Sequence, residues 1–231
     1  MASEVTYALL AGVLPALLWL SFWLREDRKN PEPDNLILKT FFLGMLAVLL
    51  VLPFQKGVEM FFPSLSFIAI ILWAASEEVF KFIAGYFGGL HSVEDNEPID
   101  PMIYMVTAAL GFVAMENTFF IFSPIQAHDL SQTILTGNFR FIGASILHVV
   151  ASGLVGVGLA STFYQTRSEK FKQTLLALTG AVILHSAFNL IIIHLDSWGL
   201  PLAFVIIWVA AALLLLTFEK IKLLRPNATR L

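Results

Sequence analysis

The sequence contains no cysteine and few charged residues, and each scarcity excludes a class of protein. Without cysteine there is no disulfide, no thiolate nucleophile and no sulfur ligand, so only His, Asp, Glu or Asn side chains could hold a metal ion. Charged residues are 13% of the 231 residues and hydrophobic ones 58%, whereas about 25% of an ordinary soluble domain is charged. This composition predicts a polytopic membrane protein, and the net charge of -3 gives no indication of nucleic-acid binding.

Several signatures of membrane proteases are also missing. Every aspartate falls between the apolar stretches or at their ends, which argues against an intramembrane aspartate dyad; these are Asp27, Asp34, Asp95, Asp100, Asp129 and Asp196. The zinc-binding helix motif His-Glu-x-x-His is absent. A serine–histidine dyad of Ser152 and His185 is compatible with the spacing, but Val150 and Ala151 stand where the rhomboid nucleophile motif has Gly-x.

About seven stretches are apolar and long enough to cross a bilayer, which takes ~20 residues. They lie near Val5–Leu24, Leu36–Gln55, Pro63–Leu90, Met102–Ser123, Phe139–Gln165, Lys172–His194 and Trp198–Phe218. The first has no basic leader and no clear small-residue cleavage site, so we interpret it as a retained span and not a signal peptide. We expect an all-α transmembrane bundle, with residues 1–231 forming a single integral-membrane domain.

Lysine and arginine positions predict the orientation, because basic loops stay in the cytoplasm. Eleven basic residues fall on one side: Arg25, Arg28, Lys29, Lys39, Arg167, Lys170, Lys172, Lys220, Lys222, Arg225 and Arg230. Only Lys56 and Arg140 fall on the other side. The bias predicts an N-terminus outside the cell and a C-terminus inside.

Charges inside the third stretch indicate chemistry. Glu77, Glu78 and Lys81 lie within it, although a charge at the bilayer centre costs about 2.5–3.5 kcal/mol on the insertion scale. On a helix Lys81 can pair with either glutamate, while the two glutamates diverge by ~100°. A buried ion pair that only joins two helices is the structural alternative. One lysine cannot neutralise two carboxylates, so the pair favours an acid–base role.

Other polar side chains stand in other apolar stretches. Glu116 has Asn117 beside it, His148 has Ser152 one turn later, and His185 shares a face with Asn189. Each alone is explained by packing or by hydrogen bonds between helices. Together, two imidazoles and a carboxylate can make a His₂Glu metal site, with another glutamate left as a base. Arg140 at the outer surface is explained by snorkelling to the interface.

The motifs resemble, in order, those of the PrsW family of bacterial intramembrane proteases. They are Glu77-Glu78-x-x-Lys81, Asn96–Asp100 leading into Gly111-Phe112-x-x-x-Glu116-Asn117, Arg140 with His148 and its Gly-rich helix, and His185-x-x-x-Asn189. The run from Asp27 to Pro33 resembles the loop after the first span of that family. The resemblance covers about residues 25 to 190.

The resemblance implies membership of the superfamily that includes CAAX prenyl endopeptidases and bacteriocin-immunity membrane proteins. Where those proteins have Phe-x-x-x-His, this chain has Phe112 followed by Glu116, so His148 would supply the imidazole. By the same resemblance, PrsW proteins make the first cut in an anti-sigma factor, near its extracytoplasmic side. We therefore expect a multi-pass protein of the bacterial plasma membrane whose substrate is a single-pass membrane protein.

These observations predict an endopeptidase that uses water activated by a glutamate. We expect Glu77 to be the base, Lys81 to brace the pair and Asn189 to donate a hydrogen bond to the oxyanion. Glu116, His148 and His185 are expected to hold a divalent ion, with zinc the expected metal and Glu78 in support. Further supporting residues are Asn117, Arg140 and Ser152.

Three alternatives remain open. In a metal-free version, Glu77 and a histidine activate the water while His185 and Asn189 form the oxyanion hole. A proton-coupled transporter would also place Glu, His and Lys at mid-membrane, but the paired broken helices of transporter sites are not evident. A non-catalytic immunity or scaffold protein could keep the same helices to bind a partner.

Overall fold

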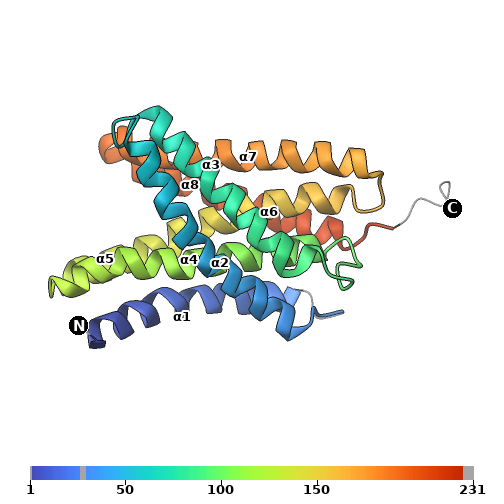
Figure 1. The fold of residues 1–231 in the computed structure, drawn as a ribbon, viewed down its shortest axis with the longest axis horizontal. Helices are drawn as coiled ribbons and strands as arrows, with labels where there is room; N and C mark the ends of the chain where they lie inside the picture. The colour runs from blue at the N-terminus through green and yellow to red at the C-terminus, as the bar shows by residue number, and fades with distance from the viewer. Residues whose placement is uncertain (1, 27–29, 226–231) are drawn as a thin grey trace.

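The computed structural model describes residues 2–26 and 30–225, and within these ranges it is all-helical (Figure 1). The α-helices are α1 (Ala2–Glu26), α2 (Asp34–Glu59), α3 (Phe67–Gly85), α4 (Asp100–Gln126), α5 (Leu130–Phe139), α6 (Ser145–Ser161), α7 (Arg167–His194) and α8 (Asp196–Ile221). Two π-helical turns, η1 (Tyr86–Leu90) and η2 (Arg140–Ala144), extend α3 and join α5 to α6. Asp27, Arg28, Lys29 and Arg230, used above for the motif and the orientation, lie outside the described residues.

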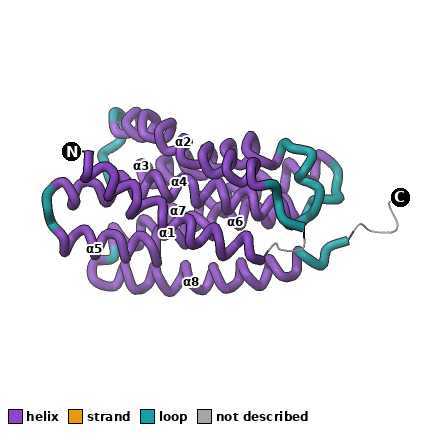
Figure 2. Tube along the Cα trace, turned by 90° about the horizontal axis from the view of Figure 1, so that it is seen from below, coloured by secondary structure: helices purple, strands orange, loops and turns teal. Residues whose placement is uncertain are grey.

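The described helices run back and forth between two ends of one bundle. In Figure 2 the connecting loops gather at these two ends. Within residues 2–26 and 30–225, six helices are long and apolar enough to cross a membrane: α1, α2, α4, the continuous α5–η2–α6 helix, α7 and α8. The third predicted stretch, Pro63–Leu90, corresponds to α3, which has 19 residues and carries Glu77, Glu78 and Lys81. In Figure 1 α1 begins at one end of the bundle and α8 ends at the other.

The fourth helix is the centre of the bundle. Helices α1, α2, α3, α5 and α6 all contact α4, and its residues from Asp100 to Ala114 are all buried. A helix that is apolar all round is stable only when other helices surround it. Helices α1 and α8 are peripheral, because only 22% of each span is buried inside the protein against 72% of α4. Their exposed leucines and phenylalanines suit contact with lipid chains.

Glycine allows α2 and α4 to cross at backbone contact. A Cβ atom at Gly111 would meet the carbonyl oxygen of Phe41, and one at Gly44 would meet that of Ala108. Small residues at such crossings are the usual way for membrane helices to pack closely. The crossing fixes the position of α2 against the helix that carries Glu116.

The fifth predicted stretch, Phe139–Gln165, begins later and ends later than the helix. Helix α5 begins at Leu130, where the Asp129 side chain accepts a hydrogen bond from the Gln132 backbone N–H. This is ordinary N-capping by an aspartate. Residues 130–138 are largely polar, so the apolar pattern that predicts a span is absent from this part of the helix.

Candidate active site

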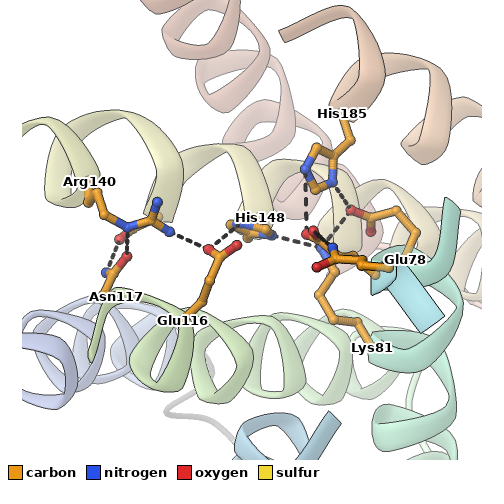
Figure 3. A network of polar contacts seen from close by, with 10 residues as sticks. Glu78, Lys81, Glu116, Asn117, Arg140, His148 and His185 are labelled. Atoms are coloured by element: carbon orange, nitrogen blue, oxygen red, sulfur yellow. Dashed lines mark hydrogen bonds and ion pairs between the residues drawn. The ribbon is translucent and has the colours of Figure 1, made fainter. Parts of the chain in front are cut away.

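Four helices bring the polar side chains together inside the bundle (Figure 3). Glu77, Glu78 and Lys81 come from α3, Glu116 from α4, His148 from α6 and His185 from α7. The two α3 glutamates, Lys81 and both histidines are buried, and Lys81 is fully inaccessible to solvent. Sequence positions more than 100 residues apart are therefore neighbours, as the site hypothesis requires.

Glu78 is held by a cation and an imidazole. Its Oε1 lies 2.5 Å from Lys81 Nζ and 2.6 Å from His185 Nδ1. A carboxylate accepts, so His185 carries a proton on Nδ1 and directs its Nε2 into the site. A carboxylate that orients an imidazole in this way is the usual support of a histidine in catalytic and metal sites.

His148 lies between a donor and an acceptor. Lys81 Nζ is 2.9 Å from His148 Nδ1, and because an ammonium group only donates, Nδ1 accepts this bond. A neutral His148 therefore carries its proton on Nε2, which lies 3.2 Å from Glu116 Oε2. The His148 ring also packs edge-on against His185, with centroids 5.0 Å apart.

Glu116 is tied to the start of η2. The Arg140 guanidinium donates to Glu116 and to the Asn117 side chain, and it stacks 3.9 Å from the centroid of the Phe120 ring. Asn117 in turn donates to Ser145 Oγ at 3.4 Å. These contacts join α4 to the π-helical turn that precedes His148, so Arg140 and Asn117 support the site from one side. Single π-helical turns inside α-helices are frequent at functional sites.

Glu77 differs from the other two glutamates because no cation bonds to it. The Gln55 side-chain amide donates to its Oε1 at 2.9 Å. Its Oε2 lies 3.6 Å from His185 Nε2 and has no hydrogen-bond partner among the described residues. Sequence reasoning missed Gln55, which appeared only as the last residue of the second predicted span. The one available signal was a polar side chain at the end of an apolar run.

Glu77 is one of the residues that line a cavity of about 580 Å³. Its polar lining comes from Gln55, Glu77, Glu116, Arg140, His148, His185 and Asn189. Asn189 lines the same cavity as His185, which suits the oxyanion role expected for it. Phenylalanines 112, 119, 120, 139, 188 and 204 supply much of the apolar lining. This size and mixture are typical of a substrate site.

Of the expected supporting residues, Ser152 takes no part in these hydrogen bonds. Ser152 is fully buried and its hydroxyl has no hydrogen-bond partner among the described residues. Neither Ser152 nor Asn117 lines the cavity. Within the described residues, the geometry thus gives Ser152 no contact with the site, and the Ser152–His185 dyad has no support from it.

Comparison with known proteins identifies the family of the chain. Residues 32–217 match the family described as PrsW family intramembrane metalloprotease. The chain belongs to the PrsW family. It is 27% identical to Protease PrsW of Halalkalibacterium halodurans over 220 residues, 93% of this chain and 95% of the relative. Protease PrsW of Bacillus subtilis is 22% identical over 190 residues, 81% and 84% of the two chains. No solved structure matches the chain.

The name of the PrsW family includes metalloprotease, so the donor set can be tested against a metal ion. One ligand atom each of Glu77, His148 and His185 lie within 4.8 Å of one another, the only such group among the described residues. Two imidazoles and a carboxylate are the donors of several catalytic zinc sites. Glu77 Oε2 and, in neutral His185, Nε2 are free to bind, whereas His148 would give up its bond to Lys81 or to Glu116. The residues present therefore fit a divalent ion.

The geometry favours a different carboxylate from the one expected. Glu116 was predicted as the third ligand, but its Oε2 is shared between Arg140 and His148. Glu77 offers an unpaired oxygen beside both imidazoles. Glu77 is thus the better candidate to complete the His₂Glu set.

Proposed function

We propose that this PrsW-family protein hydrolyses a peptide bond in the transmembrane region of a single-pass membrane protein, with Glu77 as the general base. The observation that carries the proposal is the unpaired Oε2 of Glu77, which faces His185 in a cavity of about 580 Å³. A buried carboxylate oxygen without a donor can accept a proton from a water molecule that binds beside it.

The remaining residues have supporting roles in this mechanism. Glu78 and Lys81 hold His185 and His148 in position through hydrogen bonds. Asn189 donates a hydrogen bond to the oxygen of the tetrahedral intermediate, a contribution of about 3 kcal/mol in well-studied proteases. Arg140 donates to Glu116 and to Asn117, and so holds Glu116 with its Oε2 at 3.2 Å from His148 Nε2.

Glu77, His148 and His185 are also the residues that would hold a divalent ion, with zinc the expected metal. Such an ion, when bound, acts as a Lewis acid toward water or the scissile carbonyl. Glu77 would then serve as the carboxylate ligand. Loss of Glu77 is therefore damaging in the metal-dependent and in the metal-free version.

The substrate that we propose is an anti-sigma factor with one membrane span, as the resemblance to PrsW proteins implies. The cavity is lined by the end of α2, the start of α3, the ends of α4 and α7 and the start of α8. It therefore lies toward the end of the bundle that the distribution of basic residues predicts to be extracytoplasmic. A substrate helix hides its peptide groups in internal hydrogen bonds, so the cut is expected where that helix frays, in the outer half of its span.

The test uses purified protein in liposomes with an epitope-tagged single-pass anti-sigma factor. Glu77→Gln keeps the shape and loses the charge, so cleavage should fall about 10²–10⁴-fold. Glu219→Gln is the matched control, because Glu219 is an exposed glutamate on α8. Cleavage by Glu77→Gln at the wild-type rate would refute the proposal, and mass spectrometry of the products locates the cut.

Metal analysis of the same preparations separates the two versions. The metal-dependent version predicts about one zinc ion per chain, reduced occupancy in His185→Ala, and loss of cleavage after chelation. Full cleavage by protein shown to be metal-free would leave the version in which Glu77 acts without an ion.

A further inference from the structure

We infer that Gln55 is a positioning residue for hydrolysis, because its side-chain amide fixes the Glu77 carboxylate so that one oxygen stays available to the reaction. The inference rests on the proposed function of Glu77 and deepens it. Gln55 belongs to none of the motifs that identify the site, and it lies on α2, which contributes no other polar group to the cavity lining.

The geometry separates the two oxygens of Glu77. Gln55 Nε2 donates to Oε1 at 2.9 Å, across the contact between α2 and α3. Oε2 then lies 3.6 Å from His185 Nε2, buried and without a hydrogen-bond partner among the described residues. A glutamate side chain has several rotatable bonds, so a bond to one oxygen restricts where the other oxygen points. Gln55 thereby holds the reactive oxygen toward the imidazole.

Gln55 is itself held by α3. The indole N–H of Trp73 donates to the Gln55 backbone carbonyl at 3.4 Å. Trp73 and Glu77 are four residues apart, so they lie on one face of α3. Helix α3 thus contacts Gln55 at its backbone and at its side chain. Two contacts from one helix face place the amide more precisely than the Glu77 bond alone.

The neutral amide also distinguishes Glu77 from its neighbour. Glu78 accepts from the Lys81 ammonium group, so its charge is balanced by a full positive charge. Gln55 donates a hydrogen bond to Glu77 without a formal charge. The carboxylate is therefore oriented but not neutralised by its nearest partner, as a group that must accept a proton requires.

The test is Gln55→Met, which keeps the length of the side chain and removes the donor. Loss of a hydrogen bond behind a functional group typically costs 10–100-fold in activity, so kcat for the liposome-embedded anti-sigma substrate should fall by about 10–100-fold. KM should stay at the wild-type value, and the thermal midpoint should fall only modestly, because one buried hydrogen bond is lost. Gln132→Met is the matched control, because Gln132 is exposed on α5. Its side chain donates to Thr136 and its backbone N–H to the Asp129 cap.

Infrared spectroscopy gives a second measurement that packing alone would not alter. The difference spectrum between wild type and Glu77→Gln identifies the Glu77 carboxyl band, and that band should shift in Gln55→Met but not in Gln132→Met. An unshifted band or a wild-type kcat would overturn the inference. So would a loss of kcat no larger than the fraction of Gln55→Met protein that is unfolded at the assay temperature.

The same experiment separates this inference from the proposed function. If Glu77→Gln cleaves as fast as wild type, the proposed function fails and the inference with it. If Glu77→Gln is inactive while Gln55→Met keeps the wild-type kcat, the function of Glu77 stands and only the positioning role of Gln55 is refuted.

Discussion

Removal of Lys81 should destabilise this protein far more than removal of a solvent-accessible lysine that also pairs with a glutamate three residues before it. Lys81 Nζ lies 2.5 Å from Glu78 Oε1, and both side chains are almost wholly buried. At an effective dielectric constant of about 20, charges at this distance attract by about 7 kcal/mol. The desolvation of both groups offsets much of that energy. Lys81→Met leaves the Glu78 carboxylate buried without its cation, which costs about 3–5 kcal/mol.

The double variant Lys81→Met/Glu78→Gln tests the reason for the loss. It removes both charges at once, so its stability should return to within about 1 kcal/mol of wild type, because uncharged replacements of buried pairs are often neutral. His185 keeps an acceptor in the glutamine carbonyl oxygen but loses a charged one. We therefore expect the double variant to be folded and to cleave substrate slowly.

Reversible unfolding in mixed micelles, followed by circular dichroism, measures these differences. Lys222→Met is the matched control, because Lys222 and Glu219 have the same three-residue spacing at 2.7 Å but are solvent-accessible. Exposed pairs contribute at most about 1 kcal/mol. The reasoning is refuted if Lys81→Met is no less stable than Lys222→Met, or if the double variant is as unstable as Lys81→Met.

Three further predictions concern packing, pH and the π-helical turn. Gly111→Ala should cost about 1–3 kcal/mol of unfolding free energy, because the new methyl group meets the Phe41 carbonyl oxygen at the α2–α4 crossing. Burial and the Asp100 charge raise the pKa of Asp95, in the loop before α4, from 3.8 to about 7. The folded state then holds this proton more tightly than the unfolded state and loses stability as pH rises from about 4 to about 7, so the gain in thermal midpoint of Asp95→Asn should be larger at pH 8 than at pH 5. Arg140→Lys loses the planar fork that bonds Glu116 and Asn117 together, and mass spectrometry should detect faster amide hydrogen exchange over residues 140–144 than in wild type.

The sequence was sufficient to predict the helical bundle because membrane helices are encoded by long apolar runs. The predictions for α1, α2, α4, α7 and α8 differ from the helices mainly at their ends. Helix α5 was not predicted, because residues 130–138 are largely polar and the helix is specified by the Asp129 cap and by its continuity with α6. The termini orientation rests on the basic residues and stays a prediction.

The sequence was enough to predict most of the residues that form the site, but not which of their side chains contact one another. A glutamate or histidine in an apolar run is visible in the sequence because its burial is costly. Its partner depends on how two helices cross, and no short-range pattern encodes that. For this reason Gln55, 22 residues before Glu77, was missed, and Glu116 was expected at a metal ion although Arg140 binds its carboxylate.

The adjacent glutamates show how this bundle can bury several charges and leave one carboxylate without a cation. Glu78 and Glu116 each face a cation, Lys81 and Arg140 respectively, so the cost of burying these four charges is shared within two ion pairs. Among the described residues, the Glu77 carboxylate accepts its hydrogen bond from the neutral side-chain amide of Gln55. Because residues 77 and 78 diverge by ~100° around α3, one carboxylate turns to the lysine and the other to the cavity. The helix geometry thus gives two chemically identical neighbours different partners.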